Sequence, residues 1–409
     1  MKKYLAVLPL LALASAAAVA QTDPIKILFV GNSYTFGRAD PVMSYNAANV
    51  HDLTAGFYAL NQSGTNPWEQ HPWGGVPGIF KQMTTEAGLN YDVSISARNA
   101  ATLRGQFLDT TASWTMRENV ASQNWGVVVL QEQSDAALPA GMGANANLAT
   151  VKAYANQFET FIHNGAAQTY KESTLFGSLA ACMATGLSSG SCNTTRNIAA
   201  NPNANPNTKV YLTDTWARPD MVYAHLNISN DPNTPDGAPV PDGTGTFDTL
   251  YYSTLQGMTT DLHNSFAGIA AANPKFAGVI PVGDAFQTAF NNGLVQTSGF
   301  YDANGVFVPQ SATGPADLWW KDGLHASMYG SYLDALVQFG TITGLSPLSL
   351  GANEKAAMDL GIDSSTALML ENVAAYQLGM AGVVPEPSSW ALLAGGLGLI
   401  GWRARRKSC

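Results

Sequence analysis

A short apolar run that ends in a sharp turn places the strongest constraint on this chain. Residues 26–30 read Lys-Ile-Leu-Phe-Val and are followed at once by Gly31, Asn32 and Ser33. Such a run predicts a strand that is buried on both faces of a parallel sheet. Open α/β sheets bind their ligands at the carboxyl ends of their strands. The turn is therefore expected to present the Ser33 hydroxyl at the edge of the sheet where ligands bind.

Four further apolar runs bounded by turn residues also predict central strands. They span residues 91–96, 126–130, 209–212 and 276–282. Segments with the length and apolar spacing of helices alternate with these runs or follow them, at residues 148–170, 253–272, 329–337 and 355–378, the last with a Gly-Ile-Asp-Ser break. Alternating strands and helices indicate a doubly wound α/β sandwich.

The N-terminus has the pattern of a secretory signal peptide. Lys2 and Lys3 precede an apolar stretch at residues 5–13, and Ala18-Val19-Ala20 has the small-x-small form that signal peptidase accepts. We expect residues 1–20 to be removed by signal peptidase. The mature chain would then begin at Gln21, outside the cytoplasm.

The C-terminus, residues 384–409, reads as a second targeting signal. A Pro-Glu-Pro element at residues 385–387 precedes an apolar stretch at residues 390–402 and a cluster of Arg and Lys. A simple membrane tail anchor is one interpretation, although the apolar stretch is short for a full span. The three parts in this order resemble the PEP-CTERM sorting signal of Gram-negative bacteria. That resemblance implies transient membrane anchoring through a short transmembrane helix, recognition by an exosortase, and export to the cell surface or extracellular matrix.

The charge balance excludes one class of partner. The whole chain has 29 acidic and 20 basic residues. Six of the basic residues lie in the two removable ends: Lys2, Lys3, Arg403, Arg405, Arg406 and Lys407. The mature chain is therefore acidic, and we expect no nucleic-acid partner.

Residues 21–383 are long for one domain but normal for an α/β domain with insertions, which we place near the turn-rich residues 186–208 and 227–246.

Three cysteines occur in the chain. Cys182 and Cys192 lie ten residues apart, and in an oxidising compartment we expect them to form a disulfide. Cys409 lies at the end of the C-terminal signal. No Cys/His cluster has the spacing of metal ligands, so the sequence predicts neither a metal nor a cofactor.

A serine needs two partners before it can act as a nucleophile. Its hydroxyl is weakly nucleophilic at neutral pH and requires a nearby base that is itself oriented by a third group. Asp322-Gly323-Leu324-His325 supplies both, because the Asp-x-x-His spacing brings carboxylate and imidazole together within one turn. We therefore expect Ser33 as nucleophile, His325 as base and Asp322 as the acid that orients it.

These two blocks resemble the first and last motifs of the SGNH (GDSL-type) hydrolases. Residues 26–35 look like the family's first block, and residues 322–325 look like its last. The resemblance frames nearly the whole mature domain. It implies a flavodoxin-like three-layer α/β sandwich, a Ser-His-Asp triad without a cofactor, and ester hydrolysis or acyl transfer, with acetyl-esterases of polysaccharides among the members.

Two departures from the family pattern concern the residues around the serine. Asn32 stands where the family usually has Asp, and Asn can make the same local turn bonds. The family's oxyanion hole uses the N–H of the serine, here Ser33, with a glycine N–H and an asparagine side chain. This chain has no glycine at the second position, where a backbone N–H of Asn99 or Ala100 could serve. At the third, Gln131 or Gln133 has the amide donor, and we favour Gln131.

Alternatives remain open for both the site and the function. Asp284 follows the fifth predicted strand and is a rival for the acid, although helix N-termini commonly use Asp. The leading function is a secreted ester hydrolase that acts on O-acyl groups of a small molecule or of extracellular polysaccharide. A non-catalytic glycan-binding protein could use Trp68 and Trp73, in a turn-rich segment that could roof a substrate cleft. An O-acyltransferase would use the same triad. The pair Trp319-Trp320 would form core, cleft wall or a platform for sugar stacking.

Overall fold

A parallel sheet of six strands forms the centre of the molecule. The computed structural model describes residues 23–38, 40–60, 70–109, 115–222, 250–295, 316–320 and 322–380. The strands lie in the order β2-β3-β1-β4-β7-β8, with every neighbouring pair parallel. Their bounds are β1 Ile25–Gly31, β2 His51–Asp52, β3 Tyr91–Ala97, β4 Val127–Gln131, β7 Lys209–Thr213 and β8 Phe276–Ile280. The five predicted strands are confirmed, and without the short β2 their order is that of flavodoxin-like sheets.

The two innermost strands, β1 and β4, are apolar over most of their length because helices cover both faces of the sheet. In β1, Ile27, Leu28, Phe29 and Val30 are all buried, and Phe29 lies in register with Ile95 of β3 and Val129 of β4. A strand buried on both faces has no polar side to alternate with. The same rule explains the continuous run of β4.

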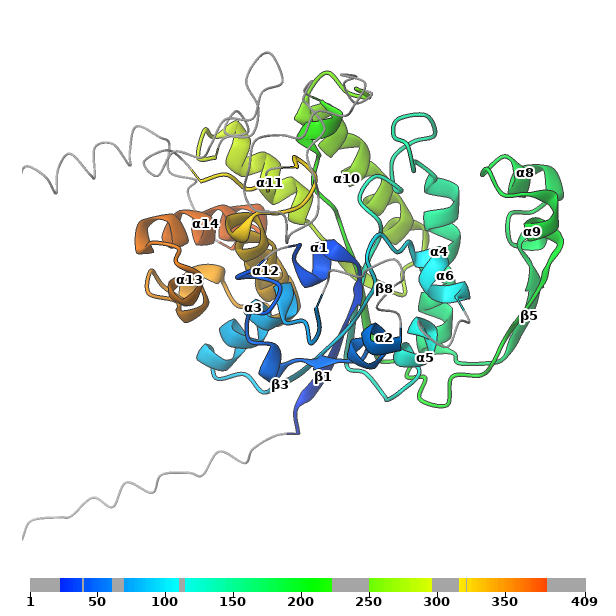
Figure 1. Cartoon of the computed structure of the whole chain (residues 1–409), viewed down its shortest axis with the longest axis horizontal. Helices are drawn as coiled ribbons and strands as arrows, with labels where there is room; N and C mark the ends of the chain where they lie inside the picture. The colour runs from blue at the N-terminus through cyan, green and yellow to red at the C-terminus, as the bar shows by residue number, and fades with distance from the viewer. Residues whose placement is uncertain are drawn as a thin grey trace, which may run out of the picture.

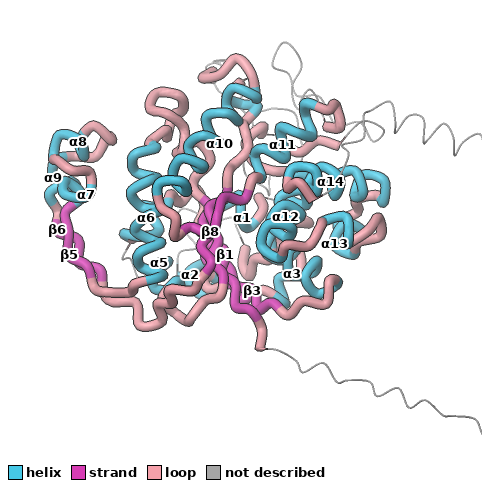
Figure 2. The backbone as a smooth tube through the Cα atoms, turned by 180° about the vertical axis from the view of Figure 1, so that it is seen from behind, coloured by secondary structure: helices cyan, strands magenta, loops and turns pink. Residues whose placement is uncertain are grey.

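Two layers of helices sandwich the sheet (Figures 1 and 2). One layer contains α3 (Gly75–Glu86), α12 (Met328–Thr343), α13 (Lys355–Leu360) and α14 (Ser364–Gln377). The other contains α4 (Leu103–Leu108), α5 (Met116–Val120), α6 (Leu148–His163) and α10 (Leu255–Ala272). Helix α11 (Val282–Asn291) contacts α10 from one layer and α12 and α14 from the other. The expected three-layer α/β sandwich is therefore confirmed.

The remaining short elements of the sandwich are α1 (Ser33–Phe36), α2 (Ala55–Leu60) and 3-10 turns at Ala47–Asn49, Pro219–Met221 and Pro347–Ser349. The predicted break near residue 361 is confirmed, because Gly361 ends α13 in the left-handed region at φ +81° and Asp363 caps α14.

Within the described ranges, no helix is long and apolar enough to cross a membrane. The predicted signal peptide, the apolar stretch at residues 390–402 and the insertion near residues 227–246 lie outside those ranges.

A small arm projects from the sandwich beyond α6 (Figure 1). The helix predicted over residues 148–170 is wrong at its end: α6 stops at His163, Gly165 follows at φ +68°, and Gln168–Lys171 forms β5. Strand β5 pairs antiparallel with β6 (Thr195–Ile198), so the predicted insertion near residues 186–208 belongs to a larger folded unit. Its helices are α7 (Glu172–Leu175), α8 (Leu179–Met183) and α9 (Ser189–Asn193). A disulfide joins Cys182 of α8 to Cys192 of α9.

Candidate active site

The nucleophile candidate lies at the carboxyl end of the central strand. Ser33 is the first residue of α1, directly after β1 and the cap residue Asn32. The Asn32 Oδ1 accepts a hydrogen bond from the Tyr34 N–H at 3.1 Å, which fixes the turn as expected for an Asp or Asn at this place. The Asn32 Nδ2 also donates to the Ala101 carbonyl at 3.0 Å, a bond that a carboxylate could not make.

The structure brings Ser33, His325 and Asp322 into one hydrogen-bonded series. The Ser33 Oγ lies 2.9 Å from His325 Nε2, and His325 Nδ1 lies 2.6 Å from Asp322 Oδ2. The other Asp322 oxygen accepts the backbone N–H groups of Leu324 and His325, each at 2.9 Å. Burial alone would raise the pKa of Asp322, but the charge of His325 and these hydrogen bonds hold that pKa below its usual value. Asp322 is therefore held as a carboxylate beside the imidazole.

Two aromatic side chains hold the turn that carries His325. The Leu324 carbonyl accepts from the Tyr34 hydroxyl at 2.9 Å and from the Trp216 indole N–H at 3.0 Å. Tyr34 and Trp216 are stacked with ring centroids 4.0 Å apart. The nucleophile turn, the segment after β7 and the His325 turn are thus locked together. Sequence reasoning missed both aromatic residues, and only the position of Tyr34 next to the serine could have pointed to one of them.

Gln131 does not take the position that an oxyanion donor requires. Its Oε1 accepts from the Asn32 N–H at 3.2 Å and from the Thr35 hydroxyl at 2.9 Å, and its Nε2 donates to the Glu132 carbonyl. The Asn32 N–H can only donate, so it fixes which end of the Gln131 amide faces the turn. The expectation that Gln131 is an oxyanion donor is therefore wrong. Its amide oxygen instead accepts hydrogen bonds from Asn32 and Thr35 and so supports the turn that carries Ser33. Gln133, the second choice, donates to the Ser134 hydroxyl at 3.2 Å.

A close approach of side chains to the backbone explains the glycine before the serine. A Cβ on Gly31 would lie 1.9 Å from Thr35 Oγ1 and 2.7 Å from Gln131 Oε1. Only glycine leaves room for this support. Each position of the Gly-Asn-Ser turn thus has its own role. Gly31 leaves room for Thr35 and Gln131, Asn32 caps α1, and Ser33 presents its hydroxyl to His325.

The loop after β3 brings two backbone N–H groups to the same edge of the sheet as Ser33. The Arg98 N–H donates to the Gly31 carbonyl at 3.2 Å, and the Asn32 side chain binds Ala101, so the loop is tied to the turn at both ends. Between these ties, the N–H groups of Asn99 and Ala100 have no hydrogen-bond partner within the described ranges, and neither has that of Ser33. Ala100 adopts φ +54°, a left-handed conformation that favours glycine. Ala100 therefore has the backbone conformation of a glycine position without a glycine.

Two ionisable side chains lie close to the turn: the buried Glu132 and the partly buried Arg218. Glu132 accepts the N–H groups of Leu103 at 3.0 Å and Gln133 at 2.7 Å, and burial raises its pKa from 4.5 to about 7. These bonds give Glu132 a structural role in joining the ends of β4 and the start of α4. Arg218 donates to the Ser134 hydroxyl at 3.0 Å and to Asp220. Arg218 was not identified from the sequence, because nothing in its local pattern marks a partly buried cation beside the turn.

The rival residues lie elsewhere. Asp284 pairs with His263 at 2.7 Å rather than with His325, so it is not the acid of the series around Ser33. Trp73 is fully buried and stacks on Phe36 and His71, which rules out a role in sugar stacking; Trp68 lies outside the described ranges. Trp319 is also core, with its indole N–H bound to the Ala217 carbonyl at 2.9 Å. Trp320 flanks His325 at a centroid distance of 6.5 Å.

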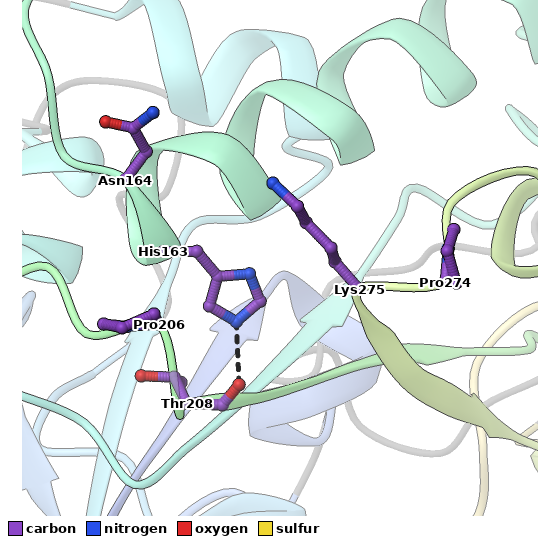
Figure 3. Close-up of a pocket in the computed structure, with 6 residues that line it drawn as sticks. All are labelled: His163, Asn164, Pro206, Thr208, Pro274 and Lys275. Carbon is purple, nitrogen blue, oxygen red and sulfur yellow. Dashed lines mark hydrogen bonds between the residues drawn. The ribbon is translucent and has the colours of Figure 1, made fainter.

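A hollow of about 520 Å³ lies at the opposite edge of the sheet (Figure 3). It is lined by His163, Asn164, Pro206, Thr208, Pro274 and Lys275. His163 Nε2 binds the Thr208 carbonyl at 2.8 Å, as the dashed line shows. Thr208 and Lys275 directly precede β7 and β8, so this hollow is at the amino ends of the strands. Ligands of open α/β sheets bind at the other edge, where Ser33 lies.

Several solved structures resemble this chain at low sequence identity. A DUF4886 family protein from Bacteroides uniformis is 13% identical, with a TM-score of 0.42 over 90% of this chain and 99% of that chain. A candidate SGNH hydrolase from Slackia heliotrinireducens is 16% identical, with a TM-score of 0.35 over 78% of this chain and 100% of that chain. Phospholipase A1 from Streptomyces albidoflavus is 12% identical, with a TM-score of 0.34 over 79% of this chain and 99% of that chain. No curated protein matches the chain.

The C-terminal segment has a match of its own. Residues 383–407 match the model of the PEP-CTERM protein-sorting motif. This agrees with the sequence-based expectation to within a few residues at each end. The chain therefore carries, at its C-terminus, a PEP-CTERM sorting motif of the kind that indicates export through an exosortase in Gram-negative bacteria.

Proposed function

We propose that this protein is an exported serine ester hydrolase that acts through an acyl-enzyme intermediate. One observation carries the proposal: Ser33 Oγ, both ring nitrogens of His325 and Asp322 Oδ2 form a continuous series with contacts of 2.9 and 2.6 Å. A nucleophile within reach of a base that a third group orients is the arrangement that activates serine.

In the first half-reaction, Ser33 Oγ attacks the ester carbonyl while His325 Nε2 takes its proton. Asp322 keeps the Nδ1 proton on the far side of the ring and stabilises the imidazolium that forms. The tetrahedral intermediate then collapses: the bond to the alcohol breaks, His325 returns the proton to the leaving oxygen, and the acyl group stays on Ser33. A water molecule repeats the sequence, activated by His325, and releases the carboxylic acid and free Ser33.

The oxyanion of each tetrahedral intermediate needs hydrogen-bond donors in place before it forms. We assign this role to the backbone N–H of Ser33 together with that of Asn99 or Ala100. The N–H groups without partners in the described ranges support this assignment, as does the double tie between the two loops. Gln131 holds the turn that carries Ser33 in place through its hydrogen bonds with Asn32 and Thr35.

The route out of the cell suggests the class of substrate. We propose that residues 1–20 are a signal peptide, that residues 21–383 form one hydrolase domain, and that an exosortase processes residues 384–409. The disulfide between Cys182 and Cys192 suits an oxidising compartment. A surface or matrix location would place the enzyme next to O-acyl esters, such as acetyl groups of extracellular polysaccharide.

The test uses two serine variants of the purified protein. Ser33→Ala should reduce p-nitrophenyl acetate hydrolysis by at least about 10⁴-fold and abolish labelling by a fluorophosphonate probe. The matched control is Ser94→Ala, which removes a buried β3 hydroxyl that makes no hydrogen bond within the described ranges. This control should keep both activity and labelling. Peptide mapping that places the label away from Ser33, or unchanged turnover in Ser33→Ala, would refute the proposal.

Acyl transfer to a sugar is the second candidate, because the same series of residues would form the same acyl-enzyme. Comparing the free acetate released with the acetylated acceptor formed separates transfer from hydrolysis. The glycan-binding alternative loses one of its two tryptophans, since Trp73 lies in the core. Labelling of Ser33 would exclude a purely binding role.

A further inference from the structure

Asp214 is a buried carboxylate that the proposed hydrolase mechanism does not use. It directly follows β7, and its side chain is fully buried. Neither of its carboxylate oxygens has a hydrogen-bond partner within the described ranges. Leaving a buried carboxylate without a donor is costly, so such a group normally binds a proton or a cation.

Two further ligand-type side chains face Asp214 from other elements. Asp284 lies in the first turn of α11, and His263 lies on α10. His263 Nδ1 is 2.7 Å from Asp284 Oδ2. One ligand atom from each of the three residues lies within 4.8 Å of the other two. Three separate elements therefore direct two carboxylates and one imidazole to a common point.

The environment of this cluster leaves room for water and for an ion to enter. His263 and Asp284 line a hollow of about 370 Å³, whose other lining residues are all Gln, Thr or Asn. Asp214 is the fully buried member of the cluster, whereas the His263 side chain is 53% exposed. An ion could enter past His263 and keep one or more water ligands.

We propose that Asp214, His263 and Asp284 bind a divalent transition-metal ion of the zinc class. The donor set contains one imidazole nitrogen and two carboxylate oxygens, and Zn²⁺ accepts both types of ligand. Ions that prefer oxygen alone, such as Ca²⁺ and Mg²⁺, match the imidazole less well. A cation there gives the buried Asp214 oxygens their partner and relieves the repulsion between the two carboxylates.

The position of the site points to a structural role. Asp214 lies two residues before Trp216, whose indole holds the Leu324 carbonyl beside His325. Gly283, next to Asp284, packs closely on this segment, because a Cβ there would lie 2.2 Å from the Thr215 carbonyl oxygen. The ion would join α10 and α11 to the segment that supports the His325 turn. Metal binding itself does not depend on the proposed hydrolase function.

The test measures Zn²⁺ binding and thermal unfolding of the chelator-treated protein. We expect one Zn²⁺ per chain by calorimetry and an unfolding midpoint that rises with Zn²⁺ concentration. Asp214→Asn and His263→Ala should each weaken Zn²⁺ binding by more than about 100-fold, beyond the loss typical of an outer-shell partner. The matched control is His51→Ala, which removes an exposed histidine paired with Asp92 at 2.9 Å. It should bind Zn²⁺ like the parent protein.

Four results would overturn the proposal. The first is the absence of any midpoint shift in the parent protein at millimolar Zn²⁺. The second is an equal shift in the parent protein and Asp214→Asn, which would mean adventitious binding elsewhere. The third is a parent protein that binds no Zn²⁺ and whose free energy of unfolding rises as the pH falls, whereas that of Asp214→Asn does not. Such a result would mean that the two carboxyl groups share a proton. Tighter binding of Ca²⁺ or Mg²⁺ than of Zn²⁺ would refute the assignment to the zinc class.

Discussion

Replacing Gln131 by methionine separates a supporting role from an oxyanion-binding role. Methionine keeps the length of the side chain but removes both ends of the amide. Three groups then lose their partner: the Asn32 N–H, the Thr35 hydroxyl and the Glu132 carbonyl. Leaving a buried polar group unpaired costs about 1 kcal/mol or more, so we expect the free energy of unfolding to fall by about 3 kcal/mol. For a chain of this length, that corresponds to a fall of about 4 °C in the unfolding midpoint.

The assay is thermal unfolding followed by circular dichroism, together with p-nitrophenyl acetate hydrolysis at a temperature well below the midpoint. Thr35→Val is the matched control, because it removes one of the three bonds and should cost about 1 kcal/mol. An oxyanion donor behaves differently: its removal lowers kcat by about 10²–10³-fold and barely changes stability. If Gln131→Met unfolds at the parent temperature and shows that loss in kcat, the supporting role is refuted.

Two further predictions concern the neighbouring loop and the buried carboxyl group. Ala100→Gly relieves a left-handed residue and keeps its N–H, so it should raise the free energy of unfolding by up to about 1 kcal/mol with ester hydrolysis retained; a lower midpoint in urea unfolding would contradict this. Because the pKa of Glu132 rises from 4.5 to about 7, the folded state binds the extra proton between these values and loses stability as pH increases through them. Glu132→Gln should therefore gain stability over the parent from pH 5 to pH 8, by on the order of 3 kcal/mol, and parallel pH profiles of the two proteins would refute this.

The sheet could be predicted from the sequence because its central strands are marked by short apolar runs bounded by turn residues. A run such as residues 127–130 is continuously apolar, and burial on both faces is the ordinary reason for that pattern. The end of α6 could not be predicted in the same way. Residues 168–171 form a strand because they pair with Thr195–Ile198, far along the chain, and no local signal reports that pairing.

Sequence by itself determined the geometry of Asp322 and His325, because the two residues lie within one turn and their hydrogen bonds are local. It also indicated a serine at the end of a buried strand. Only the tertiary structure decided what surrounds Ser33. It turned the amide of Gln131 toward Asn32, put Ala100 in a glycine conformation, and brought Trp216 to the Leu324 carbonyl. Those contacts join residues from different strands and loops. They therefore depend on which strand ends and loops lie side by side in the fold, and no spacing along the chain encodes that.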